Sequence, residues 1–424
     1  MKIERVMERV YDRRRLYLAW QQVRRNAGAA GVDEMTVKDF EGRERQLLDL
    51  IHEKLKAGHY RFKPARRVLI PKPGTDKKRK LGIPAVMDRV VSVSLHMVLE
   101  EIFDQDFTPS NFGFRRGKGQ QMAVEHMRRA IEDGYQACVS IDLKSFFDEI
   151  PHPLILKLIR RKIKDERLVT LIARALKAGV MVDGVLEKSD KGCPQGSPVS
   201  PILSNIVLNE LDHELERRGH RYCRWADDFV ILLKSQRAAE RVMEGITRYL
   251  EDELGLPVNR EKSRTAPARE VEFLGFQVHC NKIRIGTETM SRFKAKVREL
   301  TPRNNPYSMY QVVLRLKEYL KGWVGYVRIQ QFRTTFRKLD TFIRNRLRSM
   351  QLKKWKKPKK FQRMMIRAGI PVAEAQKTWI RMRRYRSIKS VPVKRVLDRK
   401  WFRKQGLLFL DDYTQRNLEL DLTR

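Results

Sequence analysis

The order of apolar and polar positions along the chain separates a region of mixed helices and strands from a second region that is almost entirely helical. Short β-branched or apolar runs between turn residues predict a hairpin around 227–228 and strands at 67–70, 80–84, 137–142 and 271–276. Apolar residues recurring every three or four positions predict helices over parts of 1–60, 86–107, 118–133, 152–178, from the loop at 191–198 to about 218, 236–254, 290–300, 308–330 and 333–355. The pattern therefore predicts an α+β fold followed by an all-α region.

Two adjacent carboxylates, Asp227 and Asp228, stand between apolar residues at the predicted hairpin turn. Burying ionised aspartates in such a setting costs free energy unless a ligand binds their carboxylates. Divalent metals are suitable ligands, because they prefer hard carboxylate oxygens. A third aspartate, Asp142, ends the strand predicted at 137–142. Three aspartates on two β elements predict a two-metal site for nucleotidyl transfer, in which Asp142 and Asp227 bridge the ions and Asp228 is a more peripheral ligand.

The charge balance indicates what such a site would act on. The chain has 90 Lys and Arg against 51 Asp and Glu, a formal charge of +39, and this excess favours nucleic acid over an anionic membrane as the partner. Residues 281–400 hold 35 basic and 6 acidic residues, a net +29, so the last third is predicted to be a basic binding region. The 42% of hydrophobic residues excludes wholesale disorder, and the chain has no run of about 18 apolar residues that would predict a membrane-spanning helix.

The four cysteines indicate neither a zinc site nor a disulfide framework. They are Cys138, Cys193, Cys223 and Cys280, with no Cys-x-x-Cys pair, and no histidine cluster has zinc spacing. We interpret them as reduced and mostly buried, which is typical of a cytosolic protein. The N-terminus lacks the apolar region of a signal peptide, so we expect a location in the cytoplasm.

Several polar residues predicted near the three aspartates suit a nucleotide. The Pro- and Gly-rich loop at 192–201 has little conformational freedom, and its Gln195 can hydrogen-bond a template nucleotide or the incoming one. Lys72, Arg79 and Lys80 form a basic hairpin suited to a triphosphate, although a solvated turn would explain that hairpin on its own.

Two further segments leave alternatives open. Phe146, four residues past Asp142, either stands against the sugar of an incoming nucleotide and excludes a 2′ hydroxyl, or belongs to the core. We interpret Asp148 as a structural acid or helix cap rather than a metal ligand. The basic run at 353–360 encloses Trp355 and favours phosphate contact over a solvated helix end.

Taken in order, these segments resemble a reverse transcriptase of the bacterial group II intron type, collinear over about residues 5–400. The resemblance is carried by motifs at 31–33, 67–73, 79–84, Phe-Gly-Phe-Arg-Arg-Gly at 112–117, 142–148, Pro-Gln-Gly at 194–196, Ala-Asp-Asp at 226–228, 259–263, 273–276 and 319–326. It implies a right-hand polymerase with an N-terminal extension (1–60), fingers and palm (61–287) and a helical, basic thumb of maturase type (288–424). It also implies RNA-templated DNA synthesis with two Mg²⁺ ions, for which Mn²⁺ can substitute.

By position, the resemblance assigns Asp142, Asp227 and Asp228 to catalysis and metal binding. Binding of the dNTP would involve Lys72, Arg79, Phe146, Gln195 and Lys262. Contacts with nucleic acid are expected at Arg115, Arg116, Lys353, Lys354, Trp355 and Lys356. The expected partners are an RNA template, a DNA or RNA primer, dNTPs and a group II intron RNA whose splicing the chain would assist, with no membrane and no zinc. Since no Cys/His-rich segment follows residue 400, we expect no endonuclease domain.

Trp225 departs from the family pattern, which usually has Tyr before Ala-Asp-Asp, and Arg116 replaces a frequent Pro. Because the predicted metal ligands are intact, we expect polymerisation to survive and fidelity, primer positioning or end joining to differ. Three functions remain open: an intron-encoded reverse transcriptase with maturase activity, a free-standing relative acting in DNA repair synthesis or defence, and a non-catalytic RNA-binding splicing factor. The three aspartates argue against the last of these.

Overall fold

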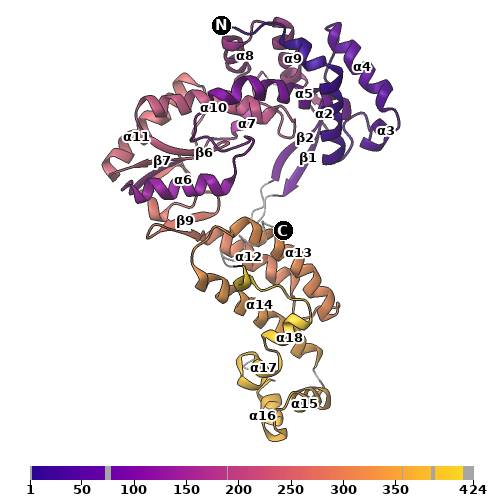
Figure 1. The fold of residues 1–424 in the computed structure, drawn as a ribbon, viewed down its shortest axis with the longest axis vertical. Coiled ribbons are helices and arrows are strands. Elements are labelled where there is room, and N and C mark those ends of the chain that lie inside the picture. The colour runs from indigo at the N-terminus through magenta and orange to yellow at the C-terminus, as the bar shows by residue number, and fades with distance from the viewer. Residues whose placement is uncertain (1, 72–77, 189, 356, 383–386, 414–424) are drawn as a thin grey trace. The chain divides into compact units, whose positions relative to one another are not determined.

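The computed structural model describes residues 2–71, 78–188, 190–355, 357–382 and 387–413. The chain divides into two compact units, Met1–Phe273 and Leu274–Arg424, whose elements are labelled in Figure 1. This division falls before the boundary predicted at 287/288. The hairpin of β9 (Phe276–His279) and β10 (Lys282–Ile285) belongs to the second unit, where the Phe276 ring lies 5.5 Å from that of Tyr326.

Four N-terminal helices precede one long buried helix in the first unit, and three of them pack against it. They are α1 (Val6–Tyr11), α2 (Arg13–Asn26), α3 (Val37–Glu41) and α4 (Glu44–Lys56), and α1, α2 and α4 contact α5 (Val86–Phe103). α5 is buried along most of its length because it is apolar on nearly all sides. Trp20 stacks on Phe40 at 4.2 Å and so joins α2 to α3. The helices predicted within 1–60 and at 86–107 are confirmed.

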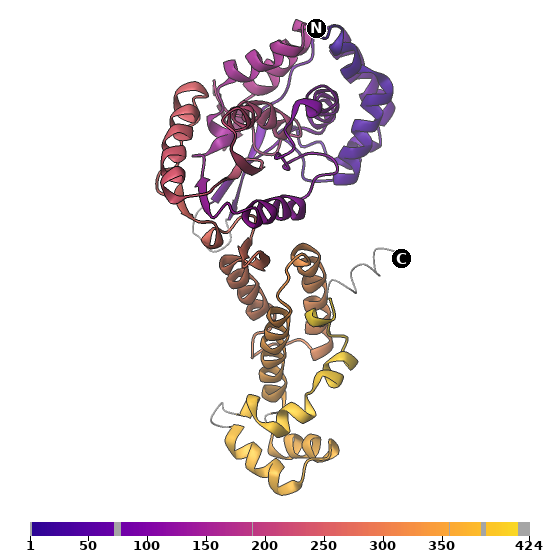
Figure 2. The same cartoon turned by 60° about the vertical axis from the view of Figure 1, so that its left-hand side comes forward.

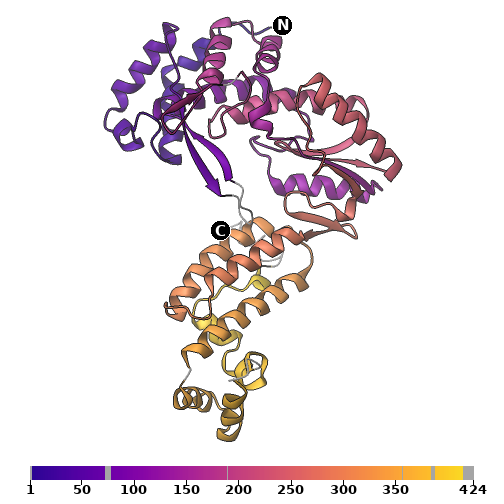
Figure 3. The ribbon, with the colours of Figure 1, turned by 180° about the vertical axis from the view of Figure 1, so that it is seen from behind.

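The first sheet has the strand order β2-β1-β4-β5. β1 (Ala65–Pro71) and β2 (Lys78–Ile83) pair antiparallel, which confirms the strands predicted at 67–70 and 80–84 (Figure 3). β4 (Val180–Val182) and β5 (Val185–Glu187) form a hairpin that the pattern did not predict, since three residues carry too little periodicity.

The second sheet has the order β6-β7-β3-β8. The predicted aspartates lie at one end of its strands β7 and β3. β6 (Arg221–Trp225) and β7 (Asp228–Leu233) form the predicted hairpin, and β3 (Ala137–Ile141) lies between β7 and β8 (Arg264–Pro267). α6 (Gln120–Glu132) and α11 (Gln236–Arg248) pack against this sheet, and α11 continues into a π-helical turn, Tyr249–Glu253. The remaining helices of the unit, seen from another side in Figure 2, are α7 (Phe146–Glu149), α8 (His152–Lys162), α9 (Glu166–Lys177) and α10 (Ser200–Arg217).

The described part of the second unit continues after the β9–β10 hairpin as a series of helices. α12 (Thr287–Leu300), α13 (Met309–Val327) and α14 (Arg333–Lys354) lie side by side (Figure 3) and confirm the three predicted helices. Four shorter helices follow: α15 (Pro358–Arg367), α16 (Val372–Met382), α17 (Val391–Val396) and α18 (Arg399–Lys404).

The strand predicted at 271–276 is wrong for most of its length. Leu274 and Gly275 have φ values of 49° and 76° and form a turn, so that β9 begins only at Phe276. A Cβ added to Gly275 would lie 2.6 Å from Oγ1 of Thr289, so the turn depends on glycine for close packing as well as for its φ.

All four cysteines are free, and Cys138, Cys193 and Cys223 are buried, which agrees with their interpretation as small apolar residues. Burial raises the pKa of the Cys138 and Cys193 thiols to about 12. In the ranges that the structure describes, no helix is both long enough and apolar enough to cross a membrane.

Candidate active site

The turn between β6 and β7 holds the two adjacent aspartates. Trp225 and Asp228 are the last cross-strand pair, so that Ala226 and Asp227 form a two-residue loop. Ala226 has a φ of 56°, in the left-handed region where a residue with a side chain is strained. Arg224 stabilises this conformation, since its Nη1 donates a hydrogen bond to the Ala226 carbonyl at 3.0 Å.

Arg224 is itself held by a buried ion pair. Its side chain and that of Asp212, on α10, are both 0% exposed, and its Nε donates to Oδ1 of Asp212 at 2.8 Å. Its Nη1 also donates to Oδ1 of Asn205 at 3.0 Å. The network extends from α10 into the hairpin, so the conformation of the aspartate loop depends on residues outside the loop.

The segment that contains Gly113 is pressed against the same hairpin. The N–H of Phe112 donates to the Arg224 carbonyl at 2.9 Å, and Nδ2 of Asn205 donates to the Gly113 carbonyl at 2.8 Å. A Cβ added to Gly113 would lie 2.1 Å from the Ala226 nitrogen. Any side chain at this position would therefore displace the aspartate loop, which explains why a glycine is needed in the 112–117 motif.

Asp142 reaches the site from the neighbouring strand. β3 pairs with β7 up to Ile141, so that Asp142 and Asp228 continue the two strands opposite one another. The Asp142 carboxylate accepts a hydrogen bond from Nδ2 of Asn259 at 3.0 Å, and Nζ of Lys262 lies 3.5 Å from its Oδ2. Lys262, predicted near a triphosphate, is thus placed beside one of the predicted metal ligands.

Burial and neighbouring negative charge disfavour the ionised forms of both hairpin aspartates. The pKa of Asp228 is raised to about 7. Burial of the carboxyl group is the largest cause, and the negative charges of Asp227 and Asp142 add to it. Part of the Asp228 side chain is nevertheless open to solvent. Burial and the Asp142 charge also raise the pKa of Asp227, while nearby Arg79 lowers it. A bound cation would favour the ionised carboxylates, so the chemistry of this donor set fits a divalent metal.

The three aspartates are not gathered into a closed metal site. Over the described ranges, no group of three or more His, Cys, Asp or Glu side chains is arranged so that it could hold a metal ion. The Asp142 carboxylate contacts a hydrogen-bond donor, Asn259, and a cation, Lys262.

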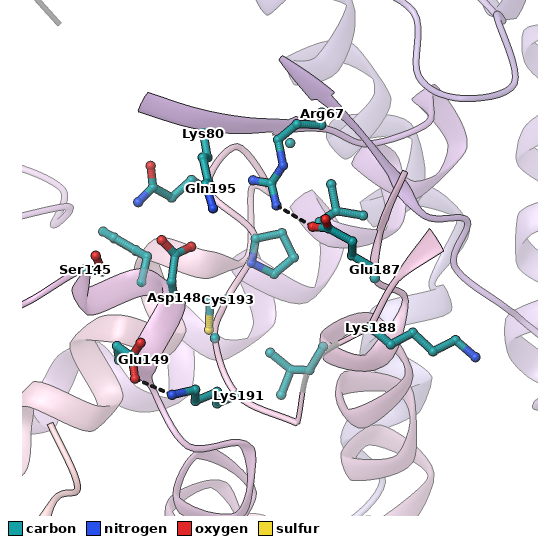
Figure 4. A pocket seen from close by; sticks show the side chains of 17 residues that line it. Arg67, Lys80, Ser145, Asp148, Glu149, Glu187, Lys188, Lys191, Cys193 and Gln195 are labelled. Carbon is teal, nitrogen blue, oxygen red and sulfur yellow. Dashed lines mark hydrogen bonds and ion pairs between the residues drawn. The ribbon is translucent and has the colours of Figure 1, made fainter. Parts of the chain in front are cut away.

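A cavity of about 350 Å³ lies between the first sheet, α7 and the loop before α10 (Figure 4). Lys80, Asp148 and Gln195 gather on one side of it. On the other side Arg67 faces Glu187, with 3.9 Å between Nη2 and Oε2. The cavity thus combines charged side chains with Gln195, the glutamine predicted to bind a nucleotide. The main-chain carbonyl of Gln195 accepts a hydrogen bond from the N–H of Gly82 in β2 at 2.7 Å.

The two neighbouring phenylalanines of α7 have different surroundings. Phe146, predicted to contact the sugar, is 3% exposed and belongs to the hydrophobic core. Phe147 is half-buried and lines the cavity instead. Asp148 also lines the cavity and is an exposed residue inside α7, whose N-cap position is Ser145, so its interpretation as a helix cap is wrong.

The two arginines of the 112–117 motif are placed differently. The side chain of Arg115 is 10% exposed, pairs with Asp104 at 2.7 Å and donates to the Thr108 carbonyl. It therefore holds the local backbone, and its prediction as a nucleic-acid contact is not supported by this placement. Arg116 is 78% exposed and pairs with Glu100 at 2.9 Å, so most of its side chain faces solvent.

The basic run at 353–360 also differs from its predicted role. Trp355 is 3% exposed, so this placement does not support its prediction as a nucleic-acid contact. Nζ of Lys354 donates to the Tyr307 carbonyl, and burial lowers its pKa, whereas Lys353 is exposed. The predicted contacts Lys72 and Lys356 lie outside the described residues.

Comparison with known proteins finds two matching family models. Residues 70–278 match the model described as reverse transcriptase (RNA-dependent DNA polymerase), and residues 290–368 match the group II intron, maturase-specific domain. Protein YkfC of Escherichia coli K12 is 32% identical over 301 residues, which cover 62% of this chain and 79% of that protein. Group II intron-encoded protein LtrA of Lactococcus lactis subsp. cremoris is 27% identical over 333 residues, which cover 63% of this chain and 55% of that protein.

Among solved structures, a Candida albicans telomerase in complex with a fragment of telomeric RNA aligns with a TM-score of 0.42 and 12% identity, over 74% of this chain and 63% of that chain. This chain spans about half the length of LtrA and about four fifths of the length of YkfC.

Proposed function

The chain belongs to the reverse transcriptase family and carries a group II intron maturase-specific domain, and from this membership we propose that it synthesises DNA on an RNA template. The observation that carries the proposal is the junction of β3 with the β6–β7 hairpin. There Asp142 and Asp228 continue neighbouring strands and Asp227 occupies the loop between β6 and β7. The substrates would be dNTPs and a DNA or RNA primer, and the second unit would bind a group II intron RNA and assist its splicing.

Asp142, Asp227 and Asp228 would hold the Mg²⁺ ions of this reaction, or Mn²⁺ in their place. When bound, such ions acidify the primer 3′ hydroxyl and neutralise the charge of the leaving pyrophosphate. The chain's own cations bind and orient the substrate. Arg79 lies near Asp227 and Lys262 near Asp142, which supports the proposal that both would hold the phosphates of an incoming nucleotide.

Primer extension with the purified full-length chain tests this proposal. On a poly-rA template with an oligo-dT primer, we expect dTTP to be incorporated in the presence of Mg²⁺ and incorporation to stop when EDTA removes the metal. Absence of Mg²⁺-dependent extension by protein that still binds RNA would contradict the polymerase proposal and support the non-catalytic RNA-binding alternative.

For selection against ribonucleotides, we expect Phe147 rather than Phe146 to contact the sugar, because only Phe147 lines the cavity. Phe147→Ala should lower the preference for dTTP over UTP by on the order of tenfold, since a steric contact with a 2′ hydroxyl is lost. Phe146→Ala should instead cost about 3–5 kcal/mol of stability, as a large-to-small core change does. Single-nucleotide incorporation with each triphosphate and urea unfolding would separate the two effects. The assignment fails if Phe146→Ala, and not Phe147→Ala, admits UTP.

A further inference from the structure

An exposed aromatic patch stands at the start of α13 in the second unit. Tyr307 is 41% exposed, Tyr310 is 62% exposed, and Leu314, one helical turn after Tyr310, is 46% exposed. Other large aromatics of this unit, such as Phe293 and Trp355, are buried in its core. Apolar surface of this kind on one face of a helix is a candidate interaction surface.

Tyr307 is held in place before any ligand arrives. The guanidinium of Arg315 lies 3.9 Å from the centre of the Tyr307 ring, and the N–H of Tyr307 donates to Oδ1 of Asn305 at 3.0 Å. The Tyr307 carbonyl accepts a hydrogen bond from Nζ of Lys354. Because the backbone and ring of Tyr307 are held from three sides, a ligand that stacks here would cost little additional conformational entropy.

The contact with Lys354 also brings positive charge beside Tyr307. Lys354 ends α14 and follows the exposed Lys353, and Lys357, Lys359 and Lys360 continue the basic run. The aromatic predicted beside this run was Trp355, which is buried, and the exposed rings come instead from the segment at the start of α13. Aromatic rings beside a row of cations are typical of surfaces that bind single-stranded nucleic acid.

We propose that Tyr307, Tyr310, Leu314 and Arg315 form a stacking platform for unpaired bases of a single-stranded nucleic acid, with Lys353, Lys357, Lys359 and Lys360 along its phosphates. This inference rests on the proposed function only in taking nucleic acid as the ligand class. It deepens that function, which already assigns RNA binding to the second unit, by naming the residues and the unpaired state of the strand that they would bind. An unpaired strand is the ligand that fits, because only unpaired bases expose the faces that can stack on a tyrosine ring or an arginine plane. A duplex would contact the lysines through its phosphates and leave the rings unused.

Fluorescence anisotropy with the full-length chain tests the platform, using a labelled 12-nucleotide RNA, DNA of the same sequence, and a duplex of equal length. Tyr310→Ala should weaken binding of the single-stranded RNA by about fivefold or more, the effect of losing one stacked base, and binding of the duplex by less than twofold. If the platform recognises only stacked bases, Tyr310→Ala should weaken binding of the single-stranded DNA as much as binding of the RNA. If the platform also requires ribose, the substitution should leave binding of the DNA unchanged. Either result supports the platform, provided that the RNA responds.

Two matched variants complete the test. Tyr310→Phe keeps the ring and should restore RNA binding, whereas Ile380→Ala removes an equally exposed apolar side chain (67%) from α16 and should change nothing. The proposal is overturned if Tyr310→Ala changes RNA binding by less than twofold, or if RNA and duplex lose affinity equally. Because binding is measured without synthesis, this failure is distinct from failure of the polymerase proposal, which primer extension alone decides.

Discussion

Replacing Asp227 with asparagine is expected to lower primer extension by on the order of 10³-fold or more, because metal ligands contribute several kcal/mol to the transition state and each tenfold is about 1.4 kcal/mol. Asparagine keeps the size of the side chain and removes its charge. The fold should tolerate the change, since burial and the Asp142 charge already disfavour the ionised form of Asp227 in the metal-free chain. Steady-state extension on poly-rA with oligo-dT would measure the loss, and urea unfolding would check the fold.

The matched control is Asp252→Asn, which removes the same charge from an exposed position after α11. It should extend primers at the wild-type rate. If Asp227→Asn also retained full extension while remaining folded, Asp227 would not be a metal ligand, and the assignment of the hairpin as the catalytic centre would have to be abandoned. RNA binding by the second unit should be the same in both variants, which separates a catalytic defect from loss of protein.

The hairpin could be predicted from the sequence because its signals are local. Two polar residues beside the apolar run at 229–233 indicate a turn, although the loop itself consists of Ala226 and Asp227, and the motifs around it place the aspartates on β elements. The long helices of the second unit were predictable for the same reason, since their apolar spacing is sustained over many residues. What local pattern could not supply was the packing that sets the turn, because Asp212 and Gly113 act on Ala226 from elsewhere in the chain.

The errors also have a physical origin. Two adjacent aromatic residues on a four-residue helix face different ways, and the spacing from Asp142 cannot show which of Phe146 and Phe147 faces the cavity. Trp355 lies in a strongly basic run, yet packing at the end of α14 buries its ring. The exposed tyrosine beside that run is 47 residues away in the sequence, so only the folded chain brings the two together.

Arg224→Ala is expected to lower the free energy of unfolding of the first unit by about 3–5 kcal/mol, because it leaves the fully buried Asp212 carboxylate without its partner. The change also removes the donor to the Ala226 carbonyl, so the strained loop that carries Asp227 loses its support and primer extension should fall with stability. Urea unfolding followed by intrinsic fluorescence, together with primer extension, would measure both effects.

Two comparison variants separate the effect of the unpaired Asp212 charge on stability from the effect of Arg224 on the conformation of the aspartate loop. Arg248→Ala breaks an ion pair with Glu244 whose side chains are 69% and 76% exposed, and should cost less than about 1 kcal/mol. Replacing Arg224 and Asp212 together with leucine removes the unpaired charge, so stability should recover in part, since apolar pairs often substitute for buried ion pairs. Primer extension should stay low in that double variant, because leucine cannot donate to the Ala226 carbonyl. Recovery of activity along with stability would instead show that the pair maintains the fold alone and has no part in shaping the aspartate loop.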